Sequence, residues 1–412
     1  MDRRILFIAM SESVHTARWI RQLADTGWDL HLFPSGSDQV HQELPKLTYY
    51  SVPGSRNRFR NSLIKRGTRR TLLPGTLHRK MRRLRADWFS EAKRLASTIE
   101  SVKPTLVHSL EIQHSGYLTF DAYQRLQKAG VALPPWMVTN WGSDTYFFAR
   151  IDEHRKKIKK VLATCDYYDC ESNRDQRAAR ELGFQGHLFP VTPNGGGFDL
   201  ESFERLRQPG PTSDRRVVLL KGYQFWAGRA MVALRAIELC ADALRGYQVR
   251  IYSANDDVRL VAQSIADSTG VDIRIIPTCD HESMMREHGK ARISMGISAS
   301  DGVSTSFLEA LVMGSYPIQS NTAAADEWIR DGESGSLVDP HQPTQIAQTL
   351  RRALSDDDLV DRASLINARV ARERLDHLKI AKQAIGMYRT VFDHANLSDQ
   401  LNTRSSKEGL AA

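Results

Sequence analysis

Short apolar runs alternate along the chain with longer segments in which apolar residues recur every three or four positions. Four runs in the first part of the chain are typical of buried strands, namely RILFIA (4–9), DLHLF (29–33), TLVHSL (105–110) and PPWMVT (134–139). The segment between the first two, HTARWIRQLADTGW (15–28), has helical spacing and ends near Gly27, a residue that commonly stops a helix. A strand, a helix and a second strand form a βαβ unit, which predicts a parallel sheet.

A second series of the same kind begins near residue 215. Its expected strands are RRVVLLKG (215–222), YQVRIYS (247–253), VDIRIIP (271–277) and ARISMGIS (291–298), with helical patterns between them. The segment RLRQPGPTSDRR (205–216), which contains Pro and Gly, separates the two series. We therefore predict an α/β protein with two Rossmann-like domains that face each other across a cleft.

The length agrees with this division, because 412 residues are too many for one ordinary core. The predicted parts are an N-terminal domain over 1–205, a C-terminal domain over 206–375, a helix over 376–396 that returns to the N-terminal domain, and a polar tail over 397–412 that frays.

Composition excludes several classes of protein. The hydrophobic fraction of 41% and the charged fraction of 25% are those of a soluble globular protein. No apolar run reaches the 18 residues that a membrane span needs, and the start MDRRILFIAMSES has too short an apolar stretch for a signal peptide. The four cysteines have no metal-ligand spacing, so reduced thiols in a cytoplasm are expected.

The net charge of +9 comes from one segment. Residues 56–86 hold twelve Lys and Arg and no acid, while the rest of the chain has 45 basic and 48 acidic residues. One interpretation is a solvated loop and helix face. The other is a surface for an anionic membrane or acceptor, because each basic group near anionic lipid contributes about 1 kcal/mol. Aromatic residues are sparse in this segment, which argues against a nucleic-acid partner.

Two familiar phosphate motifs are absent from the loops. The first strand is followed by MSESVHT, without G-x-G-x-x-G, and no Walker A lysine loop occurs. The segment LLKGYQFWAGRA instead places Lys221 at the end of a strand and Arg229 where a helix begins. Two cations and a helix N-terminus predict a diphosphate site, unless the two side chains are simply exposed surface cations.

The segment DGVSTSFLEALVMGSYPIQSN (301–321) combines a polar loop, an apolar helix with one acid, and a strand that a proline opens. One interpretation of Glu309 is a capping box with Ser306, in which Glu309 reaches back to the start of its own helix. That interpretation does not explain Asp301, which lies in a loop at the carboxyl end of a strand, where ligands bind in open parallel sheets.

These motifs resemble those of the retaining glycosyltransferases of family 4, which have the GT-B fold. The resemblance runs from the first βαβ unit to about residue 375 and is strongest over 217–340. The segment from Asp301 to Glu309 has the spacing of the Glu-x7-Glu motif, and EALVMGSYPIQSN, DEWIRDGESGSLVDP and TPNGGGFDLESF resemble family segments. Two residues depart from the family pattern: Asp301 replaces the first glutamate, and Trp141 replaces a histidine ahead of Gly142 and Asp144. Trp141 either stacks on a sugar or fills the core.

The resemblance implies transfer of a sugar from a nucleotide-diphosphate sugar to a glycan, lipid-linked or polysaccharide acceptor. Glu309 would bind the nucleotide ribose, Asp301 the donor sugar, and Lys221 and Arg229 the diphosphate, with the leaving phosphate helping to deprotonate the acceptor. The other expected donor-binding residues are Gly222, Gly302, Val303, Ser304 and Thr305. The expected acceptor or cleft residues are His15, Trp141, Gly142, Asp144 and Asn194. No cofactor and no metal ion are expected.

Two other functions remain open at this point. One is a GT-B epimerase or hydrolase that acts on sugar nucleotides, and the other is a GT-B scaffold that binds a sugar nucleotide without transfer. The expected location is the cytoplasm, with the segment 56–86 holding the protein at the inner face of the cytoplasmic membrane. The nucleotide base, the sugar and the linkage do not follow from the sequence.

Overall fold

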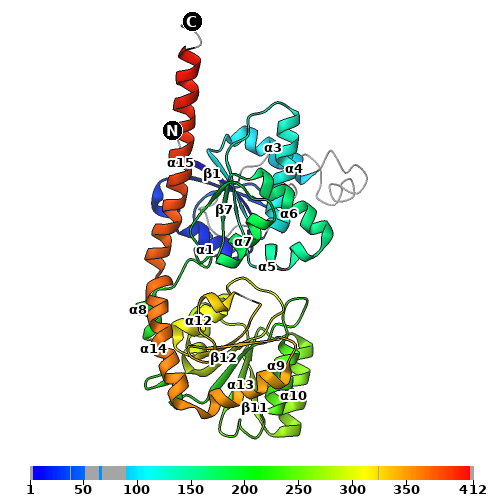
Figure 1. Cartoon of the computed structure of the whole chain (residues 1–412), viewed down its shortest axis with the longest axis vertical. Coiled ribbons are helices and arrows are strands. Elements are labelled where there is room, and N and C mark those ends of the chain that lie inside the picture. The colour runs from blue at the N-terminus through cyan, green and yellow to red at the C-terminus, as the bar shows by residue number, and fades with distance from the viewer. Residues whose placement is uncertain (1–2, 38, 52–64, 67–89, 323, 409–412) are drawn as a thin grey trace. The chain divides into compact units, whose positions relative to one another are not determined.

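The computed structural model describes residues 3–37, 39–51, 65–66, 90–322 and 324–408 (Figure 1). The chain forms two compact units, one of residues 1–196 with 381–412 and one of residues 197–380. Each unit contains one parallel sheet, as the alternating pattern predicts. The segment 56–86, on which the membrane prediction depends, lies outside the described residues apart from the short strand β4.

The sheet of the first unit has eight strands in the order β4-β3-β2-β1-β5-β6-β7-β8. Its strands are β1 (Arg4–Ala9), β2 (Asp29–Pro34), β3 (Thr48–Tyr49), β4 (Lys65–Arg66), β5 (Leu106–Leu110), β6 (Trp136–Thr139), β7 (Tyr167–Asp169) and β8 (His187–Leu188). All neighbouring strands pair in parallel. Buried side chains of β1 alternate between two cores, with Ile5 and Phe7 in one and Leu6 and Ile8 in the other, because successive side chains of a strand point to opposite faces.

Helices cover both faces of this sheet, so β1 is buried on both sides. They are α1 (Val14–Arg21), α3 (Glu91–Val102), α4 (Tyr117–Lys128), α5 (Ser143–Tyr146), α6 (Asp152–Thr164) and α7 (Asn173–Glu181). A π-helical turn, Ile112–Gly116, connects β5 to α4. The apolar pattern did not predict α4, whose polar positions separate its buried residues Thr119, Ala122, Tyr123 and Leu126.

The sheet of the second unit has six parallel strands in the order β11-β10-β9-β12-β13-β14. Its strands are β9 (Val217–Lys221), β10 (Gln248–Tyr252), β11 (Asp272–Ile275), β12 (Ala291–Gly296), β13 (Tyr316–Ser320) and β14 (Ser336–Val338). Its helices are α8 (Leu200–Glu204), α9 (Ala230–Leu239), α10 (Asp256–Thr269), α11 (His281–Lys290), α12 (Thr305–Met313), α13 (Pro343–Ser355) and α14 (Asp357–Arg374). The sequence pattern did not predict β14, α13 or α14.

The boundary between the units lies at residues 196 and 197 instead of 205 and 206. The chain passes into the second unit early because Phe198 packs in the same core as Phe307 and Leu375. Gly197 has a φ of 75°, and an added Cβ there would lie 2.8 Å from the carbonyl oxygen of Leu375. Glycine is therefore required where the chain enters the second unit.

The C-terminal helix α15 (His377–Glu408) begins in the second unit, and its residues from Ala381 belong to the first. Tyr388 on this helix is buried, and its hydroxyl lies 2.8 Å from Nε1 of Trp19 and 2.7 Å from Nδ1 of His108. The helix continues to Glu408, beyond the predicted end at 396, so part of the expected polar tail is helical. Among the described helices, none is long and apolar enough to cross a membrane.

Candidate functional site

In the second unit, the carboxyl ends of β9 and β12 are neighbours, because these two strands pair in parallel. Lys221 is the last residue of β9, and the loop after β12 leads to Asp301 and the N-terminus of α12. The Lys221 Nζ atom lies 3.7 Å from Oδ2 of Asp301 and donates a hydrogen bond of 3.2 Å to Oγ of Ser304. The structure thus brings together three of the predicted donor-binding residues.

The N-terminus of α12 is held in place by short polar contacts. The carboxylate of Asp301 accepts a hydrogen bond from the backbone N–H of Gly302 at 2.9 Å. Gly302, Val303 and Ser304 are buried, and Thr305 is the first residue of the helix. The side chain of Ser304 caps none of the helix N–H groups and instead contacts Lys221 and Ser306. An anion at this place would meet one ammonium group and a helix N-terminus.

Glu309 lies on the buried side of α12 and contacts two histidines of α11. Its Oε1 atom is 2.9 Å from Nε2 of His281, and its Oε2 atom is 3.5 Å from Nε2 of His288. Burial by itself would raise the pKa of Glu309, but the two histidines outweigh it and lower this pKa to about 2. The capping-box interpretation is wrong, because the helix begins at Thr305 and Glu309 bonds to His281 instead of its own N-terminus.

Arg229 is placed differently from Lys221. It is the N-cap residue of α9, and its Nη1 atom donates hydrogen bonds to the carbonyl groups of residues 225–228. Its described hydrogen bonds therefore close the loop between β9 and α9 and do not reach Lys221 or Asp301. Gly222 at the start of this loop is packed so closely that an added Cβ would lie 2.8 Å from the carbonyl oxygen of Tyr252.

The loop that Arg229 closes carries three half-exposed aromatic side chains. Tyr223, Phe225 and Trp226 are 41%, 51% and 48% exposed. The ammonium group of Lys221 lies 4.7 Å from the centre of the Tyr223 ring, a cation–π distance. The end of β9 that carries Lys221 thus leads directly into a loop with half-exposed aromatic side chains.

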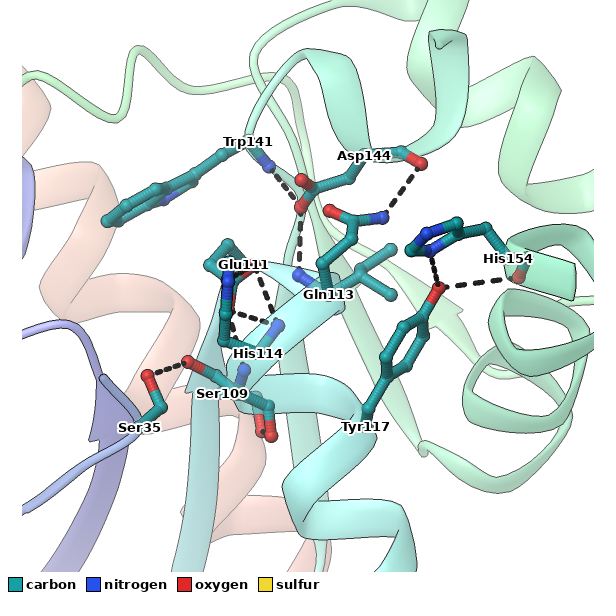
Figure 2. A network of polar contacts seen from close by, with 11 residues as sticks. Ser35, Ser109, Glu111, Gln113, His114, Tyr117, Trp141, Asp144 and His154 are labelled. Carbon is teal, nitrogen blue, oxygen red and sulfur yellow. Dashed lines mark hydrogen bonds and ion pairs between the residues drawn. The ribbon is translucent and has the colours of Figure 1, made fainter. Parts of the chain in front are cut away.

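In the first unit, a second group of polar side chains gathers where β5 and β6 end (Figure 2). Asp144 is buried, and its Oδ2 atom accepts hydrogen bonds of 2.9 Å from the backbone N–H groups of Ile112 and Trp141. Burial and the nearby carboxylate of Glu111 raise the pKa of Asp144 well above its usual value. Asp144 therefore holds the two loops to each other, and its contact with an acceptor stays a prediction.

Glu111 directly follows β5 and has φ 76° and ψ 158°, a backbone conformation that is almost confined to glycine. Such a conformation costs about 1–3 kcal/mol. The carboxylate of Glu111 offsets this cost by accepting hydrogen bonds from the backbone N–H groups of His114 at 2.8 Å and Ser115 at 2.5 Å. The same carboxylate lies 3.3 Å from Nδ1 of His114. Figure 2 shows these contacts next to the pair of Tyr117 and His154.

The remaining predicted residues of the first unit lie at the same edge of the sheet. The ring of Trp141 packs against the core that contains α1, and its centre lies 5.6 Å from that of His15. Gly142 has φ 38° and begins α5. Asn194 is buried and donates a hydrogen bond of 3.1 Å to the carbonyl oxygen of Asn140. Trp141 is thus partly buried against this core, and its stacking on a sugar stays a prediction.

Glu111, His114, His281 and His288 were not among the site residues expected from the sequence. The first two follow the strand TLVHSL directly, so their position at the carboxyl end of a predicted strand was available from the sequence. The pairing of Glu309 with His281 and His288 depends on how α11 packs on α12. The sequence around each residue alone does not predict this packing. Among the described residues, no group of three or more His, Cys, Asp or Glu side chains is arranged to hold a metal ion.

Both halves of the chain match known families of glycosyltransferases. Residues 4–167 match the family described as Glycosyl transferase 4-like, and residues 204–369 match the family described as Glycosyl transferases group 1. A D-inositol 3-phosphate glycosyltransferase of Nocardioides sp. is 30% identical over 129 residues, which make up 29% of this chain and 28% of that relative. This match thus spans less than a third of the curated relative.

Solved structures resemble the whole chain. An α,α-trehalose 6-phosphate synthase from Burkholderia multivorans has a TM-score of 0.68 at 14% identity, covering 96% of this chain and all of the other. Anabaena HepE in complex with UDP and glucose has a TM-score of 0.65 at 13% identity, covering 94% of this chain and 99% of the other. At such low identities the likeness establishes the fold. Because the two glycosyltransferase matches together span most of both sheets and the solved structures share the fold, the chain is a glycosyltransferase with the GT-B fold.

Proposed function

We propose that this protein transfers a hexosyl group from a nucleotide-diphosphate sugar to a hydroxyl group of a glycan, lipid-linked or polysaccharide acceptor, with retention of the anomeric configuration. The contact of Lys221 with Asp301 and Ser304 at the N-terminus of α12 carries this proposal. A cation and a helix N-terminus at the carboxyl edge of a parallel sheet suit a nucleotide diphosphate. The structural relative HepE binds UDP and glucose, which agrees with this donor class.

Each donor-site residue has a separate role in this reaction. The ammonium group of Lys221 and the N-terminus of α12 stabilise the negative charge that develops on the leaving diphosphate. Asp301 accepts hydrogen bonds from hydroxyl groups of the donor sugar. Glu309 accepts hydrogen bonds from the ribose hydroxyl groups. It can do so because a carboxylate has about four lone-pair sites, and the described contacts with His281 and His288 leave some of them unused.

Retention is proposed from the family 4 resemblance, in which the leaving phosphate helps to deprotonate the acceptor hydroxyl on the same face of the sugar. The chain's own contribution is to hold that phosphate with Lys221 at the N-terminus of α12. The anomeric configuration of the product, measured by NMR from coupling constants, tests this part. An inverted product would contradict it.

The donor class is tested first by thermal shift with UDP-, GDP- and ADP-glucose, because a ligand that binds the folded protein stabilises it by about 2.7 kcal/mol at 100 times its Kd. One of the three nucleotides should raise Tm clearly above the others. If none does, the proposed donor is wrong. Turnover of the donor without any acceptor would instead favour an epimerase or hydrolase, and binding without turnover a scaffold.

The Lys221→Met variant tests the site itself. Removal of one group that stabilises developing charge lowers the transfer rate by about 10² to 10³-fold. The variant should also lose affinity for the nucleoside diphosphate more than for the nucleoside monophosphate, because Lys221 is assigned to the diphosphate. Lys128→Met on the exposed face of α4 is the matched control and should change neither quantity. Equal rates for the two variants would contradict the assignment.

A further inference from the structure

The two ring nitrogens of His114 have different surroundings: Nδ1 lies next to the Glu111 carboxylate, and the side chain as a whole is exposed. Its side chain is 60% exposed, whereas that of Glu111 is 4% exposed. The carboxylate of Glu111 lies 3.3 Å from Nδ1 of His114 and holds the backbone of the same residue (Figure 2). In the described part of the chain, no hydrogen bond uses Nε2 of His114. In the neutral ring, a carboxylate at Nδ1 favours the tautomer with the proton on Nδ1, so Nε2 of the neutral ring accepts a hydrogen bond.

The charged groups that act on the His114 ring are both carboxylates. They are Glu111 and Glu12. The hydrogen bond with Glu111 raises the pKa of His114 most, and the negative charges of Glu111 and Glu12 raise it further. Glu12 follows β1, the strand next to β5, and its Oε2 atom is buried without a hydrogen-bond partner among the described residues. A second anion near His114 would therefore meet two negative charges.

A fully buried amide lies at the same edge of the sheet and needs partners. Asn140 is 0% exposed, and both polar atoms of its side chain are without a hydrogen-bond partner among the described residues. It directly follows β6, and the backbone N–H of Glu111 bonds to the carbonyl oxygen of the preceding residue, Thr139. The Asn140 side chain can both donate and accept hydrogen bonds, and Nε2 of His114 can accept one. Such a combination matches a ligand with several hydroxyl groups.

We infer that His114, positioned by Glu111, binds a hydroxyl group of the acceptor and that this site selects an uncharged polyhydroxyl compound over a phosphorylated one. This inference rests on the proposed function, because it assigns the acceptor of the same reaction. A neutral hydroxyl donates a hydrogen bond to Nε2 of the neutral His114 ring and accepts hydrogen bonds from neighbouring donors. A phosphate group at this place would be repelled by Glu12 and Glu111, and no described cation acts on the ring to offset them.

The test uses the full-length protein and follows its histidine rings by ¹H–¹⁵N NMR, with myo-inositol as the neutral probe and inorganic phosphate as the anionic probe. Myo-inositol should shift the His114 signals, and phosphate at the same concentration should not. His114→Gln should weaken the apparent affinity for myo-inositol about tenfold, the effect of one lost hydrogen bond. His187→Gln, an exposed histidine on β8 at the edge of the same sheet, is the control and should leave the affinity unchanged.

Two further variants separate the roles of the carboxylates. Glu111→Gln should change the tautomer signature of the His114 nitrogens, which a merely structural residue would leave alone. Glu12→Gln should let inorganic phosphate shift the His114 signals. Phosphate that shifts the wild-type signals as strongly as myo-inositol does would overturn the selection of uncharged ligands.

The outcome is separable from that of the proposed function, because nucleotide binding is measured in the same samples. If a nucleoside diphosphate raises Tm but myo-inositol does not move the His114 signals, this inference is wrong and the proposed function stands. If myo-inositol binds and no nucleotide does, the polyol site stands and the proposed donor fails.

Discussion

Glu309 shows how a carboxylate can be buried in an apolar helix without losing its charge. Burial disfavours the ionised form, but His281 at 2.9 Å and His288 at 3.5 Å favour it more strongly, and the pKa of Glu309 is lowered to about 2. Breaking such a buried pair by removing one partner costs about 3–5 kcal/mol. The packing of α11 on α12 therefore depends on this residue, whatever ligand it also binds.

The pH dependence of stability follows from the same shift. In the unfolded chain the pKa of Glu309 returns to its usual value near 4.5, so the unfolded state takes up the proton first as pH falls. The contribution of Glu309, about 3 kcal/mol, is complete above that value and is lost as pH falls toward 2. Urea unfolding between about pH 6 and pH 3 should show a smaller loss of stability in Glu309→Gln than in the wild type. Glu181→Gln, an exposed residue of α7, is the control, and equal slopes in all three proteins would contradict the shift.

Several site residues could be predicted from the sequence because they follow recognisable strands. Lys221 and Asp301 each lie at the carboxyl end of an apolar run, and parallel strands bring such ends together. Arg229 was also predicted at the diphosphate, but its guanidinium group bonds to carbonyl groups of its own loop. A cation's position in the sequence does not tell whether a ligand or the backbone will take its hydrogen bonds.

At the scale of elements, the buried strands were predicted best. The strands β1, β5, β9 and β12 are nearly continuous apolar runs because both their faces are covered. The helix α4 was missed because its buried positions include Thr119 and Tyr123, and the two-residue strands β3, β4 and β8 are too short to show a pattern. The turn at Glu111 could not be predicted either, since its backbone conformation is one that sequence statistics reserve for glycine.

The loop between β9 and α9 depends on a glycine at its closing end. An added Cβ at Gly228 would overlap with the backbone carbonyl group of Tyr223, which cannot move without opening the loop. Gly228→Ala should lower the free energy of unfolding by about 1–3 kcal/mol, as overpacking does elsewhere. It should also weaken nucleotide binding, because the loop begins next to Lys221.

Gly386→Ala is the matched control for that variant. Gly386 lies inside α15 with no atom within 4 Å of an added Cβ. Alanine should stabilise the helix there by about 0.5–1 kcal/mol. Chemical denaturation and nucleotide titration of both variants provide the measurement. If the two substitutions act in the same direction, the close packing at Gly228 is not what shapes the loop.

At the scale of the whole molecule, two units with separate sheets and cores were predictable from the two alternating series. The exact boundary was not, because Phe198 is one of several apolar residues near the linker and only the packed core shows that it belongs with Phe307. Charge is the one whole-molecule property that the sequence reports completely. The concentration of basic residues in 56–86 can be counted from the sequence without knowledge of any side-chain contact.

This charge distribution predicts binding to anionic membranes. Arg82, Arg83 and Arg85 belong to the segment of twelve basic residues without an acid. Each basic group near an anionic bilayer contributes about 1 kcal/mol, so the triple alanine variant should bind vesicles that contain phosphatidylserine about a hundredfold more weakly. Vesicles of phosphatidylcholine alone should bind neither protein, and added salt should weaken the binding because the Debye length shortens.

The triple variant Lys156→Ala, Lys159→Ala, Lys160→Ala on the exposed face of α6 removes the same charge from a different place. Sedimentation with vesicles then separates a local basic surface from the effect of net charge. If the two triple variants lose affinity equally, the binding follows net charge and residues 56–86 have no special part in it. If the Arg82, Arg83, Arg85 variant binds as the wild type does, the membrane role is wrong, and the interpretation of a solvated loop and helix face is favoured.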